Sequence, residues 1–138
     1  MKQELDKESI KALIQYRIKR AKETLLEAEV LIENKFYNAA VNRLYYACYY
    51  SVNALLLKHR ITAKTHAGIK QMFGLHFIVN GRLDPKLGHF YNQLFNDRIT
   101  SDYDDFIAYD KEMIDEIFPK AKDFINQLSK IIEINDQL

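Results

Sequence analysis

The segment over residues 39–57 has helical periodicity and two opposite faces that both favour burial. Its apolar face carries Val41, Leu44, Tyr45, Cys48, Val52, Leu55 and Leu56. Its opposite face carries Ala39, Arg43, Tyr46, Tyr50, Asn53 and Leu57. A surface helix needs only one apolar stripe. This helix is therefore expected either to be central to the fold or to pack against a second subunit.

The tyrosine-rich opposite face has two interpretations. Tyr46 and Tyr50 could stack on nucleic acid bases, as aromatic side chains do in single-strand binders. Aromatic residues are also enriched in protein interfaces. We favour a homodimer interface formed by Tyr46, Tyr50 and Asn53, with Arg43 and Asn53 hydrogen-bonding across it.

Helical periodicity covers nearly all of the chain. Apolar residues three or four positions apart predict a first helix over about residues 7–34. A short break near residues 35–37 makes it an antiparallel neighbour of the next helix, which ends near His59. Thr65 is a suitable N-cap for a third, shorter helix, in which Gly74 is unfavourable.

The second half of the chain has equally clear helix signals. The Asp-Pro pair at residues 84–85 predicts the start of a fourth helix. We expect an acidic connection over residues 99–109 and a fifth helix over about residues 110–134. Pro119 lies inside the apolar stripe of this last helix and should kink or split it. The sequence therefore predicts an all-α, up-and-down bundle of about five helices in a single domain, residues 1–138.

Composition excludes few functions but indicates the environment of the chain. The net charge of +1 gives no overall signal for binding to nucleic acid or membrane, so local basic clusters matter more. The single cysteine, Cys48, excludes an internal disulfide and fits a reducing compartment. The N-terminal residues are charged and no apolar run reaches membrane-spanning length. We expect a cytoplasmic protein without a membrane segment.

Arg98 ends the fourth predicted helix and precedes an acidic turn. An arginine in this position can bind a phosphate or a carboxylate through two parallel hydrogen bonds. The alternative, which the composition favours, is an ion pair with Asp97, Asp102 or Asp104. The acidic turn could also hold Mg²⁺, but no metal-ligand spacing supports this, and we expect no bound metal or other cofactor.

Residues 58–68 combine basic side chains, two histidines and a predicted helix N-terminus. Free backbone N–H groups beside Lys64, Thr65 and His66 would form an anion site. A solvated basic loop with a locally hydrogen-bonded His66 is an equal alternative. The four histidines are never three or four positions apart, which disfavours a helical metal pair.

Three segments together resemble the HEPN domain family, in its small single-domain bacterial and archaeal branch. They are Ala-Val-Asn-Arg-Leu-Tyr-Tyr-Ala over residues 40–47, Lys-Thr-His-Ala-Gly over residues 64–68 and Arg-Ile-Thr-Ser-Asp-Tyr over residues 98–103. The sequence over residues 121–125 also fits. The order and spacing of these segments cover most of the chain.

The resemblance implies an all-α bundle that commonly dimerises and is usually encoded beside a nucleotidyltransferase of the MNT type. Such pairs often act as toxin and antitoxin. Many members are metal-independent RNases that use an arginine and a histidine, with four to six residues between them, from both subunits. In such a pair the histidine handles the proton of the ribose 2′-hydroxyl and the arginine stabilises phosphate charge.

This chain departs from the nuclease pattern, because Tyr103, Asp104 and Asp105 occupy the positions where the histidine would follow Arg98. We therefore predict a module without the standard pair, which binds a nucleotide, an RNA phosphate or a partner nucleotidyltransferase. Its predicted binding residues are Arg43, Tyr46, Lys64, Thr65, His66, Arg98, Asp102 and Tyr103. The alternatives are a metal-independent RNase toxin with a divergent site and a purely structural helical adaptor.

The RNase alternative has four candidate catalytic residues, which are Arg98, His66, Asp102 and Tyr103. His66 would have to enter the cleft from the third helix to replace the missing imidazole. Both predictions depend on one geometric expectation. The guanidinium of Arg98 and the imidazole of His66 should converge on one solvent-reachable groove flanked by tyrosines.

Overall fold

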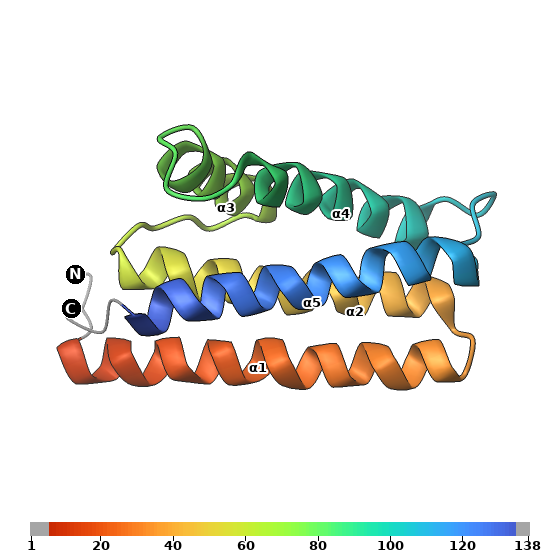
Figure 1. Ribbon diagram of the computed structural model, residues 1–138, viewed down its shortest axis with the longest axis horizontal. Helices are drawn as coiled ribbons and strands as arrows, with labels where there is room; N and C mark the ends of the chain where they lie inside the picture. Colours follow the sequence, from red (N-terminus) through yellow and green to blue (C-terminus); the bar gives the residue numbers. More distant parts are fainter. Residues whose placement is uncertain (1–5, 135–138) are drawn as a thin grey trace.

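Two long antiparallel helices form the spine of the fold. The computed structural model describes residues 6–134 and contains in them five α-helices, one π-helical turn and no strand. The first helix, α1 (Lys7–Glu33), is joined by a short turn to α2 (Tyr37–Lys58), which runs back along it (Figure 1). The turn places Lys35 at a φ of 65°, and the N–H of Phe36 donates to the carbonyl of Leu31. This bond and the positive φ of Lys35 close α1 in the manner of a Schellman motif.

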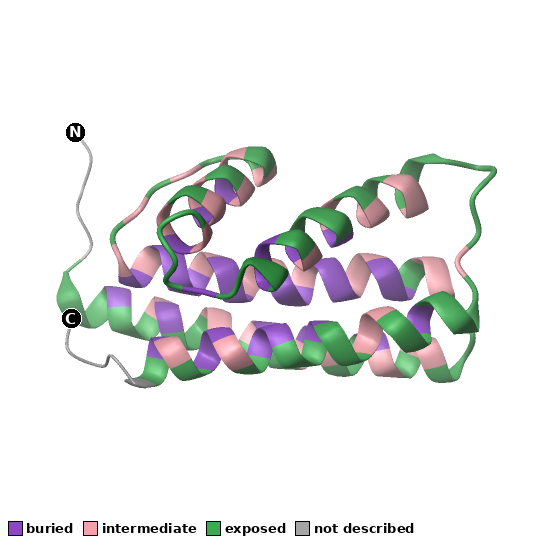
Figure 2. Cartoon of the chain, turned by 45° about the horizontal axis from the view of Figure 1, so that its top comes forward, coloured by how far each residue is buried: buried purple, intermediate pink, exposed green. Residues whose placement is uncertain are grey.

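The second helix, α2, lies at the centre of the molecule. It contacts α1, α3, α4 and α5, and purple buried positions run along most of it in Figure 2. The buried residues of α2 include Val41, Leu44, Tyr45, Ala47, Cys48, Ser51, Val52, Ala54, Leu55 and Leu56. This central position explains why the helix has two faces that avoid water. Tyr46, Tyr50 and Asn53 on the opposite face are half-buried.

The third and fourth helices form a second layer above the spine (Figure 1). The side chain of Thr65 accepts a hydrogen bond from the Gly68 N–H and caps α3 (His66–Phe73). The helix continues as a π-helical turn, η1 (Gly74–Ile78). Asp84 accepts from the Lys86 N–H and caps α4 (Pro85–Tyr103). The predicted caps of both helices are thus confirmed.

One prediction about the second half of the chain was wrong, and another was wrong in one of its two alternatives. The acidic connection does not begin at Ile99, because α4 continues to Tyr103. Arg98 and Asp102, four positions apart, form an ion pair that supports this last turn. The last helix, α5 (Lys111–Ile134), is not split at Pro119. Proline has no N–H, so the carbonyl of residue 115 lacks its usual helical donor at position 119. Residue 115 is exposed, so water can replace that donor.

Aromatic side chains fill the space between the layers. Tyr91 of α4 stacks on Phe124 of α5, with ring centroids 5.6 Å apart and planes 9° apart. Phe73 packs edge-on against both rings, and all three side chains are buried. This aromatic cluster holds α4 against the spine and so helps to position the residues at the C-terminal end of α4. Within residues 6–134, no helix is apolar over a length sufficient to cross a bilayer.

Gly74 and Gly88 form a matched pair for testing how closely α4 packs on η1. A Cβ at position 88 would lie 3.0 Å from Ile78 Cγ1, whereas one at position 74 would meet no atom within 4 Å. Because alanine is favoured over glycine in a helix, Gly74→Ala should raise the free energy of unfolding by about 1 kcal/mol. Gly88→Ala should gain less or lose stability, because Ile78 must move. Equal gains in urea unfolding would contradict this close packing.

Candidate functional site

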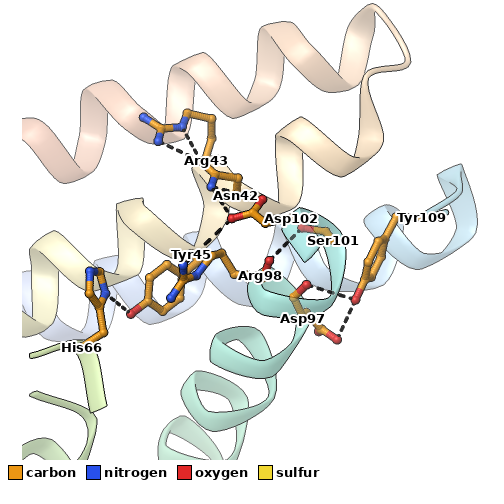
Figure 3. A network of polar contacts seen from close by, with 9 residues as sticks. All are labelled: Asn42, Arg43, Tyr45, His66, Asp97, Arg98, Ser101, Asp102 and Tyr109. Carbon is orange, nitrogen blue, oxygen red and sulfur yellow. Dashed lines mark hydrogen bonds and ion pairs between the residues drawn. The ribbon is translucent and has the colours of Figure 1, made fainter. Parts of the chain in front are cut away.

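A single buried phenol, that of Tyr45, joins a histidine and an arginine from different helices (Figure 3). The Tyr45 hydroxyl lies 2.8 Å from Nδ1 of His66, the first residue of α3. The guanidinium carbon of Arg98, on α4, lies 4.9 Å from the centroid of the Tyr45 ring. The structure thus brings together at Tyr45 the two side chains that the sequence predicted to converge. The solvent-reachable groove between them stays a prediction.

Arg98 is held mainly by aromatic faces. Its side chain is only 12% exposed, and its guanidinium also lies 6.0 Å from the ring centroids of Tyr46 and Phe95. Its Nε is buried and has no hydrogen-bond partner among residues 6–134. Its nearest carboxylate oxygen, in Asp102, is 4.0 Å away. Most of the N–H donors of this guanidinium therefore have no carboxylate partner within hydrogen-bond distance among residues 6–134.

Asp102 links Arg98 to the outer face of α2. Its carboxylate accepts from Nδ2 of Asn42 at 3.1 Å and 3.4 Å, and Oδ1 of Asn42 accepts from two nitrogens of Arg43. Figure 3 shows this chain of polar contacts running from α4 to α2. The expected ion pair between Arg98 and one of its neighbouring aspartates is therefore confirmed, with Asp102 as the partner.

His66 lies among tyrosine rings of α2. It stacks on Tyr49, with centroids 4.4 Å apart and planes 19° apart, and it meets Tyr46 edge-on. Burial, and next the positive charge of Arg98, lower the pKa of His66 below its ordinary value of 6.5. The imidazole is consequently neutral near pH 7. Its hydrogen bond reaches a residue of another helix, so the alternative in which His66 bonds locally is wrong.

The hydrogen bond between His66 and Tyr45 decides what the imidazole can do. Burial raises the pKa of Tyr45 to about 12, so the phenol keeps its proton near neutrality. When Tyr45 donates to Nδ1, the neutral ring carries its proton on Nε2 and can donate to a phosphate. When Nδ1 donates to Tyr45, Nε2 is free to accept a proton. The first tautomer suits binding and the second suits base catalysis.

Three predicted site residues lie apart from this cluster. The Thr65 hydroxyl is occupied as the cap of α3. Lys64 is exposed and has no polar partner among the residues that the structure describes. Tyr103, the last residue of α4, is 76% exposed. Among residues 6–134, none of the three forms a side-chain hydrogen bond or an ion pair with Tyr45, His66 or Arg98.

The outer face of α2 is partly covered by arginines of the same chain. Arg43 lies over the ring of Tyr46 at 5.1 Å and pairs with Glu27 of α1 at 3.8 Å. Arg20 of α1 lies over the ring of Tyr50 at 5.4 Å. The amide of Asn53 donates to the carbonyl of Tyr49. The polar groups of Arg43 and Asn53 are thus satisfied in part within one chain.

Sequence reasoning missed the central residue of the site. Tyr45 was assigned to the apolar face of its helix, which is correct but incomplete. A buried tyrosine usually needs a partner for its hydroxyl, and this was the available signal. Asn42 was missed as well.

The single cysteine, Cys48, is buried, and burial raises the pKa of its thiol, as expected for a small core residue.

The described part of the chain contains no group of three or more histidine, cysteine, aspartate or glutamate side chains that could hold a metal. The acidic residues on either side of Arg98 include two that bind protein groups. Asp97 accepts from the Tyr109 hydroxyl at 2.9 Å, and Asp104 accepts from the Phe106 N–H.

Comparison with known proteins gives a consistent result. The model of the HEPN domain family matches residues 14–132. A UPF0332 protein of Thermotoga maritima is 37% identical over 88% of this chain and 92% of its own length. Two proteins of Methanocaldococcus jannaschii are named "Putative toxin MJ0605" and "Putative toxin MJ0142". The first is 36% identical over 96% of this chain and 98% of its own length. The second is 37% identical over 83% of this chain and 78% of its own length.

Titration of the histidines by NMR tests the electrostatics of the site. His66 should titrate below 6.5, and Arg98→Gln should raise its pKa because a nearby positive charge is removed. Arg82→Gln is the matched control, because Arg82 lowers the pKa of His59 instead. A His66 pKa that does not respond to Arg98→Gln would show that the two groups do not interact.

The same shift predicts a pH effect on folding. A histidine with a lowered pKa binds its proton less well in the folded than in the unfolded state. The free energy of unfolding should therefore fall as the pH drops through about 6.5, the unfolded value of His66. His66→Gln should make this fall shallower, and the remaining slope should include His59, whose pKa is also lowered by burial.

Proposed function

This chain belongs to the HEPN domain family, and we propose that it is a toxin-type member that binds a phosphate group of RNA or of a nucleotide. The observation that carries this proposal is the meeting of Arg98 and His66 at the Tyr45 phenol. The names of the two Methanocaldococcus relatives support a toxin-like role. No residue of this site needs a metal for the proposed contact.

The polar geometry explains how a phosphate would be held. Arg98 supplies a fixed positive charge, since aromatic rings hold its guanidinium and the nearest carboxylate is 4.0 Å away. His66, when Tyr45 donates to its Nδ1, supplies a neutral donor from Nε2. Asp102 opposes an incoming anion, but Asn42 binds the same carboxylate and can hold it aside. We therefore expect the site to bind one phosphate, which would approach Arg98 from the side away from Asp102.

A metal-independent RNase with a divergent site is the second candidate. It is favoured by the lowered pKa of His66, because a neutral imidazole can accept the proton of a 2′-hydroxyl. Arg98 would stabilise the phosphate charge that develops. This chemistry requires the tautomer in which His66 donates to Tyr45. In this candidate, the catalytic histidine is His66 on α3 and does not follow Arg98 in the sequence.

We also propose two protein partners, a second copy of the chain and a nucleotidyltransferase. A homodimer would use Tyr46, Tyr50 and Asn53, which are half-buried in the single chain. A nucleotidyltransferase of the MNT type would act as the antitoxin partner in a two-component system. The exposed end of α4, with Tyr103, is available for contact with such a protein.

Binding of RNA and ATP tests the phosphate site. Arg98→Gln should weaken affinity for short RNAs and ATP about tenfold or more, because a charge-assisted hydrogen bond is lost. Asp102→Asn should strengthen affinity, because it removes a negative charge beside Arg98. Lys122→Gln, on the exposed face of α5, is the charge-matched control. Melting temperatures show whether each variant is folded.

The outcomes of this experiment separate the two candidate functions. Affinity that is the same in Arg98→Gln and Lys122→Gln would exclude the proposed phosphate site. RNA cleavage by the unaltered protein that is lost in both Arg98→Gln and His66→Gln would identify the nuclease instead. Binding without cleavage supports the binding module.

Sedimentation at several concentrations tests the dimer. Tyr50→Ala should weaken self-association by about 1 kcal/mol or more, the usual loss at an interface aromatic residue. Its effect on the unfolding of the single chain should be smaller, because Tyr50 is only half-buried. Tyr16→Ala on α1, where the ring is 58% exposed, is the control. A monomer at all concentrations would exclude the interface.

A further inference from the structure

The turn between η1 and α4 contains an Asn-Gly pair, Asn80 and Gly81. Asn80, Gly81 and Arg82 are all exposed. Gly81 has a φ of 79°, a backbone conformation that residues with a side chain rarely adopt. Every other asparagine of the chain precedes a residue that carries a side chain. At this turn alone, therefore, no side chain on the next residue shields its backbone nitrogen from an asparagine amide.

Hydrogen bonds hold the side chain of Asn80 over the backbone of the same turn. Its Oδ1 accepts from the Arg82 N–H at 3.3 Å, which forms an Asx turn. Its Nδ2 donates to the carbonyl of His76 at 2.5 Å. The ring that an Asx turn closes includes the side-chain Cγ and the backbone nitrogen of the next residue. Cγ of Asn80 is therefore kept close to the nitrogen of Gly81.

This geometry favours a reaction between the two residues. We propose that Asn80 is a site of spontaneous deamidation, which converts it to isoaspartate or aspartate. The backbone nitrogen of Gly81 loses its proton to a base in the solvent and forms a bond to Cγ of Asn80. The bond from Cγ to Nδ2 breaks, and Nδ2 takes up a proton and leaves as ammonia. The product of this step is a cyclic succinimide.

Water completes the modification by opening the succinimide at one of its two carbonyl carbons. Attack at Cγ of Asn80 breaks its new bond to the Gly81 nitrogen and gives aspartate. Attack at the backbone carbonyl carbon breaks the original peptide bond to that nitrogen and gives isoaspartate. In both cases the Gly81 nitrogen takes up a proton. Water is thus the only co-reactant and ammonia the only molecule released.

One hydrogen bond opposes the reaction. The N–H of Gly81 donates to the Ile78 carbonyl at 3.1 Å, and this bond has to open before the nitrogen can attack. Exposed turns open locally at a small cost in free energy. The turn therefore reacts from a brief open state, without unfolding of the bundle.

Asn34 offers a matched comparison at the end of α1. Its Nδ2 donates to the carbonyl four residues earlier, that of Val30, at 2.8 Å, as the amide of Asn80 does in its own turn. The next residue, Lys35, has a φ of 65°, close to that of Gly81. The two asparagines thus share their local backbone context. They differ in whether the next residue has a side chain.

The modification would change the link between η1 and α4. Isoaspartate continues the chain through Cβ, so it adds one carbon to the backbone between positions 80 and 81. Either product carries a carboxylate, which cannot donate to the His76 carbonyl. The N–H of Leu83, just after this turn, donates to the Phe77 carbonyl at 2.8 Å, and we expect isoaspartate to weaken this bond. None of these steps depends on phosphate binding at the candidate site.

Peptide mapping by mass spectrometry, after incubation of the intact protein in buffer, tests this proposal. Asn80 should deamidate about tenfold faster than Asn34, because the side chain of Lys35 hinders attack by its nitrogen. Lys35→Gly should bring the rate at Asn34 close to that at Asn80. Gly81→Ala should slow the reaction at Asn80 about tenfold. Enzymatic methylation of isoaspartate distinguishes this product from aspartate.

Hydrogen exchange tests the structural consequence. In the isoaspartate fraction the Leu83 amide should exchange faster. The Phe36 amide, which bonds to a carbonyl at the end of α1, should not change.

Two results would overturn the proposal. One is equal deamidation of Asn80 and Asn34 in the unaltered protein, and the other is an Asn34 that stays unreactive in Lys35→Gly. Gly81→Ala places a side chain at a positive φ and can disturb the turn. Lys35→Gly carries no such strain, so it tests the proposal even if Gly81→Ala unfolds.

Discussion

The buried ring of Tyr45 connects the core of the protein to its candidate site. The ring is part of the core, because it stacks with Tyr91 of α4 with ring centroids 5.9 Å apart. It is also part of the candidate site, because its hydroxyl hydrogen-bonds to His66 and the Arg98 guanidinium lies over the ring. Three helices therefore hold one another through a single side chain. Any movement of α3 or α4 relative to α2 would change the distance between the imidazole and the guanidinium.

The helical architecture followed from local physical chemistry. Thr65 and Asp84 cap their helices through side-chain oxygens, as short polar residues do. The errors arose where neighbouring structure outweighs local preference. The acidic residues after Arg98 were expected to end the helix, but an ion pair to Asp102 extends it. Pro119 was expected to kink or split α5. The helix is not split, and the hydrogen bond that proline removes falls on a solvent-facing turn.

The candidate site was predictable only in part. Arg98 and His66 were identified because their residue types and positions at helix ends indicate anion binding. Their link through Tyr45 could not be read from the sequence. It depends on the packing of α3 and α4 on α2, and Tyr45 lies 21 residues before His66 in the chain. Lys64 and Thr65 were predicted to join His66 in one site. The Thr65 hydroxyl caps α3 and Lys64 is exposed, so a binding role for these two residues stays a prediction.

The π-helical turn between Gly74 and Ile78 has a consequence for alignment with shorter chains. Its i→i+5 bonding, seen in the bond from the Val79 N–H to the Gly74 carbonyl, accommodates one residue more than an α-helical turn. Removal of a single residue here would let the helix continue with ordinary bonding while Phe73 and the loop before α4 kept their places. A one-residue gap at this turn is therefore compatible with an unchanged fold, whereas the same gap in α2 would rotate Tyr45 away from both of its partners.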